Sequence, residues 1–114
     1  IGEHMSMELE IQRMIDKFRR RMSKDPETRA KVEPITKTLN IDLGDEFYSM
    51  KIEHAEITEF RPELIDDPDV TLMTTREYLQ ELIDGTLRPM KAYVTKKIRI
   101  KGKIEDIMHL KALF

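Results

Sequence analysis

The residues that could bind a metal or act as nucleophiles are few in this chain, and they are not spaced for either task. The histidines His4, His54 and His109 lack the short spacing of zinc ligands. Because the chain has no cysteine, it cannot form disulfides, thiolate nucleophiles or cysteine-type zinc sites. The serines lack the flanking glycines of a nucleophile elbow, and no glycine-rich loop is present to hold nucleotide phosphates. We therefore expect a protein that needs no cofactor and is not an enzyme.

The densest group of metal-type oxygen ligands is the acidic run Asp66-Asp67-Pro68-Asp69. A calcium loop would place oxygen ligands at regular alternate positions, and this run does not follow that pattern. Aspartate next to proline is typical of a capped turn, which is the interpretation we prefer.

The composition indicates one small folded domain. The chain has 114 residues, of which 39% are hydrophobic and 37% charged, and its formal net charge is −2. No apolar run approaches the roughly 20 residues that a membrane-spanning helix needs. We expect a cytoplasmic protein, since the lack of cysteine fits a reducing compartment. We interpret residues 1–6 as an expression-tag remnant and residues 7–114 as the domain.

Hydrophobic periodicity predicts the elements that would position a site. Apolar residues at Ile11, Met14, Ile15, Phe18 and Met22 form one stripe of a helix, and Asp25-Pro26 begins a short second helix that ends near Val32. Alternating residues predict strands over 38–43, 48–53, 56–60, 70–73 and 97–101. Between the last two, Thr74-Thr75-Arg76-Glu77 predicts a capped helix that ends at Gly85, and Pro89 begins another short one.

A last amphipathic helix is predicted from Ile104 to Phe114. Its apolar face contains Ile104, Ile107, Met108 and Leu113-Phe114, with Leu110 or Lys111 between them. This order of elements predicts an α+β fold with a mostly antiparallel five-stranded sheet and helices on one face of it.

The second half of the chain, residues 69–114, resembles the sterol carrier protein type 2 family in the order and spacing of its motifs. The chain departs from the usual pattern at two places: Thr86 stands in place of a lysine, and Thr95-Lys96 stands where eukaryotic members often have Gln-Gly. The motifs that carry the resemblance are Asp69-Val70-Thr71, Leu82-Ile83-Asp84-Gly85-Thr86-Leu87-Arg88-Pro89, Ala92-Tyr93, Lys97-Ile98-Arg99-Ile100-Lys101-Gly102 and Met108.

The resemblance implies non-enzymatic binding and transfer of lipids in an apolar tunnel between the sheet and the helices. Fatty acids, fatty acyl-CoA and phospholipid are the expected ligands, with sterol less supported because of the two departures. Methionines suit such a tunnel, since their flexible side chains adapt to a mobile ligand. The C-terminal helix is our candidate lid, and we expect deletion of residues 104–114 to abolish binding. The residues expected to line or close the tunnel are Tyr78, Leu82, Leu87, Met90, Tyr93, Ile100, Ile104, Met108 and Phe114.

Basic residues gather in the segment 88–103, which contains seven of them and no acid. This segment could make transient contact with anionic lipid head groups. It could equally be the solvated face of an edge strand that is protected from aggregation by its charge. We do not expect nucleic-acid binding, because the net charge is −2 and no aromatic-rich basic motif accompanies the segment.

Two other functions stay open from the sequence. The apolar helix faces could pack on a partner, which would make the chain a protein-interaction or homodimerisation module. Alternatively, the domain could be an accessory to an acyl-processing enzyme. The oligomeric state, monomer or homodimer, does not follow from the residues.

Overall fold

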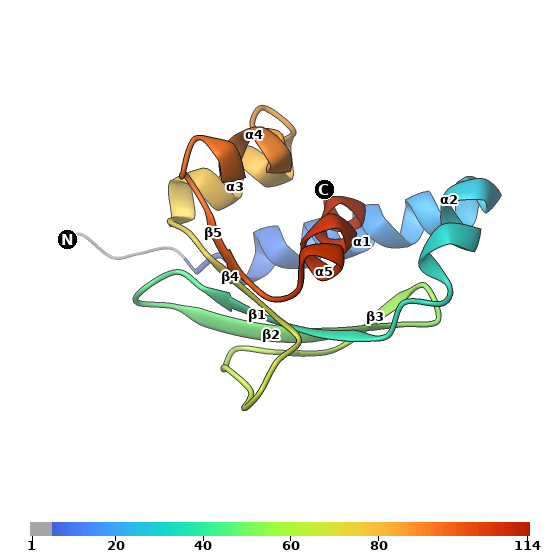
Figure 1. Ribbon diagram of the computed structural model, residues 1–114, viewed down its shortest axis with the longest axis horizontal. Coiled ribbons are helices and arrows are strands. Elements are labelled where there is room, and N and C mark those ends of the chain that lie inside the picture. The colour runs from blue at the N-terminus through green and yellow to red at the C-terminus, as the bar shows by residue number, and fades with distance from the viewer. Residues whose placement is uncertain (1–5) are drawn as a thin grey trace.

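The protein is described by a computed structural model that covers residues 6–114. It has two layers, a five-stranded sheet and a group of helices that lies on one face of that sheet (Figure 1). The strands follow the order β3-β2-β1-β4-β5 across the sheet. Their bounds are β1 (Lys37–Asp42), β2 (Phe47–Glu53), β3 (Glu56–Arg61), β4 (Val70–Met73) and β5 (Arg99–Lys101).

The sheet is mixed, with one parallel pair among four. β1, β2 and β3 form an antiparallel meander, and β5 pairs antiparallel with β4. β4 instead runs parallel to β1, because the chain leaves β3 and crosses the sheet before it forms β4. The expected α+β fold with a mostly antiparallel five-stranded sheet is therefore confirmed.

The two N-terminal helices follow the predicted pattern. α1 (Glu8–Lys24) buries the whole predicted stripe, and α2 (Pro26–Val32) begins where expected. The Asp25 side chain caps α2 by accepting a hydrogen bond from the backbone N–H of Thr28 at 3.1 Å. The buried stripe of α1 belongs to the same hydrophobic core as buried residues of β1, β2 and β4.

The remaining helices are α3 (Arg76–Asp84), α4 (Pro89–Val94), α5 (Ile104–His109) and the 3₁₀ helix η1 (Leu110–Leu113). Thr75 caps α3, one residue later than the predicted capping box, and Thr74 donates instead to the carbonyl of Lys97 at 3.0 Å. Gly85 ends α3 as expected, with a φ of 83° that a side chain would disfavour. This left-handed turn directs the chain from α3 into α4.

The loop between β3 and β4 passes beneath the open face of the sheet, and this changes the burial of Asn40. Simple alternation places Asn40 on the solvent side of its strand, yet it is 5% exposed. Its amide donates to the carbonyl of Ile65 at 2.9 Å and accepts from the Ile65 N–H at 3.0 Å.

The acidic run in the same loop is also bound to the sheet, because Asp69 accepts a hydrogen bond from the Thr38 N–H at 2.8 Å. That bond keeps the pKa of Asp69 below its usual value.

A polar cluster around Glu46 joins the start of α1 to the sheet and to α3. The Glu46 carboxylate accepts hydrogen bonds from the Met7 N–H at 2.7 Å, from Ser6 at 3.2 Å and from the Tyr48 hydroxyl. It also pairs with Arg76 at 2.8 Å. Burial and the neighbouring Glu46 raise the pKa of Tyr48 to about 12. Ser6 thus takes part in the fold, although we assigned it to the segment outside the domain, and residues 1–5 lie outside the described part of the chain.

The C-terminal segment has the expected helical form, but only the second part of its predicted apolar face is buried. Ile104 is 83% exposed and Met108 is 47% exposed, whereas Leu110 and Leu113 are buried. The structure therefore corrects the prediction for Ile104 and Met108, which face solvent, whereas the two leucines of the last turn, a 3₁₀ helix, pack against the core. β5 is also shorter than predicted, since Lys97 and Ile98 precede the strand.

Candidate functional site

The best candidate site is a cavity of about 420 Å³ on the helical side of the molecule. Its apolar lining comes from Leu82 on α3, Leu87 in the following turn, Met90 on α4 and Phe114 at the end of the described chain. Leu82 and Leu87 are buried, whereas Met90 is 38% exposed and therefore stands near the opening. A cavity of this size falls within the range of about 300–1,000 Å³ that is typical of small-molecule sites.

The polar part of this cavity is cationic. Arg21 from α1, Arg88 from the turn before α4 and Lys111 from η1 line it, and among the described residues that line it none is acidic. Arg21 donates hydrogen bonds to the carbonyl oxygens of Ala112 and Phe114, both at 3.0 Å. Arg88 and Lys111 form no ion pair with any residue between 6 and 114. The cavity thus combines an apolar interior with cations that could bind an anionic head group.

Four of the nine expected site residues, Leu82, Leu87, Met90 and Phe114, come together in this cavity. Within residues 6–114, no strand residue lines the cavity, so the expected tunnel between the sheet and the helices stays a prediction. Tyr93 and Ile100 instead line a second, more open groove of about 690 Å³ beside β5. Tyr78 is half-buried against the core, with the Lys97 ammonium 5.6 Å from its ring centre.

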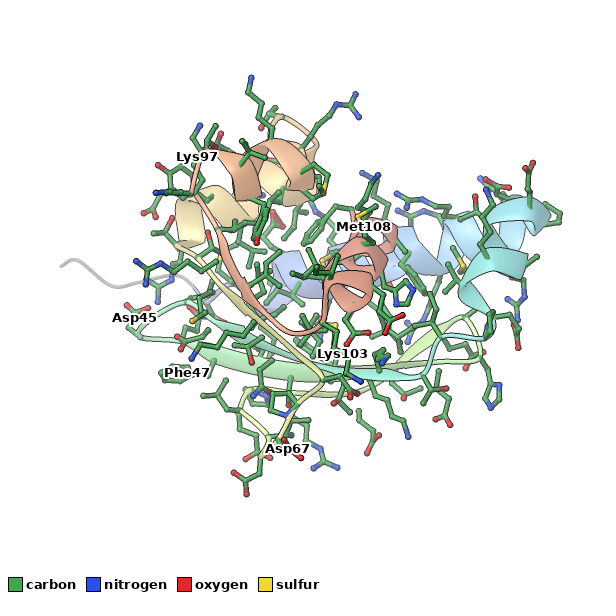
Figure 2. The ribbon with its side chains drawn as sticks, in the orientation of Figure 1. Asp45, Phe47, Asp67, Lys97, Lys103 and Met108 are labelled. Atoms are coloured by element: carbon green, nitrogen blue, oxygen red, sulfur yellow. The ribbon has the colours of Figure 1, made fainter. Side chains whose placement is uncertain are left out.

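Two expected site residues, Ile104 and Met108, lie outside both hollows. Met108 is on the side of α5 that faces away from the sheet (Figure 2). Both side chains are exposed, and Asp106 is the buried residue of α5, so contact of Ile104 and Met108 with a ligand stays a prediction.

Two polar contacts hold the C-terminal segment, defined here as α5 and η1, in place. Asp106 is 2% exposed, and its carboxylate pairs with the Lys37 ammonium of β1 at 2.9 Å. This hydrogen bond, with the charges of Asp106 and Asp69, raises the pKa of Lys37 above its usual value. The Arg21 bonds to the carbonyls of Ala112 and Phe114 are the second contact. The candidate lid is therefore fastened at both of its ends by charged side chains.

The sequence interpretation missed Arg21, Lys111, Lys37 and Asp106. Arg21 stands in a run of three arginines at the end of α1, and the pattern alone does not distinguish the one that turns toward the cavity. Asp106 sits between apolar residues at positions 104 and 107, which is a weak signal that it faces inward. No pattern within one element could pair it with Lys37.

Other kinds of site find little support in residues 6–114. No group of three or more histidine and acidic side chains there is arranged to hold a metal ion. None of the helices in this range has the length and apolar character needed to cross a bilayer.

Comparisons with known proteins give a consistent result for the family. The sterol carrier protein of Aedes aegypti in complex with palmitate superposes with a TM-score of 0.62 at 19% identity, over 94% of each chain. Sterol carrier protein domain 2 of Helicoverpa armigera gives 0.60 at 21% identity, over 99% of this chain and 91% of that one.

The inverting sec-alkylsulfatase Pisa1 from Pseudomonas sp. gives a TM-score of 0.63 at 19% identity, over 75% of this chain. This chain spans only 14% of the sulfatase's length, so the likeness concerns one part of that enzyme. No curated protein sequence shows a significant match. The model of the SCP-2 sterol transfer family matches residues 15–114. The chain therefore belongs to the SCP-2 sterol transfer family.

Proposed function

We propose that this protein binds a single-chain or acyl-bearing lipid with an anionic head group and transfers it without chemical change. The observation that carries the proposal is the cavity in which Leu82, Leu87, Met90 and Phe114 meet Arg21, Arg88 and Lys111. An apolar interior with a purely cationic rim suits a fatty acid, a fatty acyl-CoA or a phospholipid. Membership of a lipid-transfer family and the palmitate-bound relative support the same class of ligand.

The hydrophobic contribution is large enough for useful affinity. Removing an acyl chain of about 15 methylenes from water is worth about 12 kcal/mol before the costs of ordering are subtracted. A membrane offers the chain a similar environment, so exchange between bilayer and protein needs no chemical step. Transfer then depends on access to the cavity rather than on catalysis.

The head group decides between lipid classes. A carboxylate or phosphate at the rim would gain charge-assisted hydrogen bonds from the three cations. The hydroxyl of a sterol carries no charge and would gain less from them. We therefore expect acyl anions to bind more tightly than sterols of similar apolar area.

The test is a titration of delipidated protein with an environment-sensitive fluorescent fatty acid, followed by competition with palmitate, acyl-CoA, phospholipid and sterol. Saturable binding near micromolar affinity, with palmitate displacing the probe better than sterol, would support the proposal. The double variant Arg88→Gln/Lys111→Gln should weaken palmitate about threefold per residue and leave sterol unchanged, because exposed ion pairs contribute modestly. The variant Lys17→Gln/Arg20→Gln on α1 removes the same charge away from the cavity and is the matched control.

Absence of saturable binding by folded, delipidated protein would refute the lipid-carrier function. Equal loss of palmitate affinity in the control variant would refute the role of the rim, because it would show that only net charge matters.

A further inference from the structure

The groove beside β5, here called the β5 groove, combines apolar and basic side chains at the edge of the sheet. It has a volume of about 690 Å³, and β5 is the last strand in the sheet order. Met73, Ile98 and Ile100 supply apolar surface, and Tyr93 and Val94 from α4 add to it. Val94 is 73% exposed, so this apolar surface is open to solvent. Lys96, Arg99 and Lys101 complete the lining.

The cations of the groove are not neutralised within the fold. Lys96, Arg99 and Lys101 form no ion pair with any residue between 6 and 114, and no acid occurs in the sequence between Asp84 and Glu105. Some basic residues elsewhere in the fold are paired with acids. Arg13, for example, pairs with Glu10 and with Asp84, both at 3.0 Å. The groove thus presents uncompensated positive charge next to exposed apolar side chains.

The basic segment extends beyond the groove toward the C-terminal segment. Figure 2 shows Lys97 near the α4 end of the stretch that contains β5 and Lys103 at its other end, just before α5. Ile104 follows at once and is 83% exposed. Among the described residues, five of the eight exposed large apolar side chains fall between positions 90 and 108.

We infer that the β5 groove and α4 dock on the surface of an anionic lipid bilayer. The inference deepens the proposed function, on which it rests, because it names the surface from which the lipid is collected or to which it is delivered. Mixed basic and apolar side chains are the combination that binds such surfaces: lysine and arginine are attracted to anionic head groups, and apolar side chains enter the interface.

The geometry connects this surface to the cavity. Met90, in the first turn of α4, lines the cavity, while Tyr93 and Val94, at the other end of the same helix, line the groove. A helix of six residues is only about 9 Å long. A bilayer in contact with the groove would therefore lie close to the opening of the cavity.

An acidic protein partner fits the same surface less well. Five of the seven basic residues in segment 88–103 are lysines, a residue type that is depleted in protein–protein interfaces. β5 has only three residues, which gives an added strand little backbone to pair with. Lysine side chains suit a bilayer surface, where their heads stay solvated among the phosphates.

The experiment is co-sedimentation of the full chain with vesicles of phosphatidylcholine alone or with about 30% phosphatidylserine, at salt concentrations from about 0.01 to 1 M. We expect binding only to the anionic vesicles, with loss at high salt. The variant Lys96→Gln/Arg99→Gln/Lys101→Gln should lower the partition coefficient about a hundredfold, at about fivefold per charge.

Val94→Asp tests the apolar part of the surface, and Leu9→Asp on α1 is its matched control, because the two side chains are 73% and 74% exposed. Val94→Asp should lower partitioning about tenfold, whereas Leu9→Asp should have little effect. Circular dichroism confirms that each variant is folded. Wild-type protein that binds both kinds of vesicle equally, or neither, would overturn the inference and leave an acidic protein as the occupant.

Palmitate affinity in vesicle-free solution separates this inference from the proposed function. The groove variants should keep wild-type palmitate affinity, because none of the substituted residues lines the cavity. Absence of palmitate binding with normal vesicle binding would refute the lipid-carrier function and leave the docking surface standing. Loss of palmitate affinity in the groove variants would contradict the view that the groove and the cavity are two distinct binding regions.

Discussion

Replacing Arg21 by glutamine should release the C-terminal segment from α1. The Arg21 guanidinium donates to the carbonyl oxygens of Ala112 and Phe114, both at 3.0 Å, and a glutamine side chain is too short to reach both. A hydrogen bond from a charged donor contributes about 1.5–3 kcal/mol when buried. Because Arg21 is half-buried, we take about 1 kcal/mol for each bond. Loss of both therefore corresponds to about 2 kcal/mol, or roughly a thirtyfold larger open population.

Native-state hydrogen exchange measures this opening directly. We expect the amides of η1 to exchange about thirtyfold faster in Arg21→Gln, with amides of β1 and β2 unchanged. Arg20→Gln is the matched control: it is the adjacent arginine, it is exposed, and it makes no hydrogen bond or ion pair with another residue of the described chain. Unchanged η1 exchange in Arg21→Gln, or equal acceleration in Arg20→Gln, would refute the idea that these two bonds hold the segment closed.

Three further substitutions test polar contacts that position the site. Asp106→Asn should destabilise the protein by removing the charge that pairs with Lys37 at 2.9 Å. Because the paired Lys37 has a raised pKa, the stability difference should be fully present below pH 10.5 and disappear as the pH rises through the folded-state value, as urea titrations at several pH values would show. In the variant Glu46→Gln, the free energy of unfolding should depend less on pH in the acid range than it does in the wild type. Although burial favours the neutral form, hydrogen bonds from Tyr48, Met7 and Arg76 hold the pKa of Glu46 below 4.5, so its contribution is present above that pH and lost below it. Equal acid sensitivity of the variant and the wild type would contradict this role. Asn40→Ala should lower the free energy of unfolding by about 2–3 kcal/mol, since it leaves the backbone N–H and C=O of Ile65 without their partners. A urea midpoint close to that of the wild type would show that the contact between Asn40 and the loop contributes little to the stability of the fold.

The elements that depend on local signals could be predicted from the sequence. The α1 stripe, the Asp25 cap of α2 and the Gly85 end of α3 each depend on residues within a few positions of one another. Such signals act through backbone geometry and helix periodicity, which do not require the rest of the fold. The family motifs at 69–102 depend on the same kind of local order.

Features that depend on distant residues could not be predicted in this way. The parallel pairing of β4 with β1 follows from the path of the loop beneath the sheet, which also buries Asn40. The cationic rim is assembled from three elements, α1, the turn before α4 and η1. The burial of the charged Asp106 side chain depends on Lys37, which is distant in the sequence and pairs with it only in the folded chain. These contacts are set by tertiary packing, which local residue patterns along the chain do not specify.

The way in which the C-terminal segment is held determines how a ligand could enter. Only Leu110 and Leu113 of its large apolar side chains are fully buried, while Ile104 and Met108 remain in contact with water. Burial of two leucines contributes about 3–6 kcal/mol, less than the roughly 12 kcal/mol gained by burying an acyl chain of about 15 methylenes. The two Arg21 hydrogen bonds add about 2 kcal/mol to this, and the Lys37–Asp106 pair adds a further polar contribution. Opening of the segment is therefore a modest step compared with the gain from the ligand. A bound acyl chain that contacts Phe114 would add its own apolar contacts to the closed form, and palmitate should then slow amide exchange in η1.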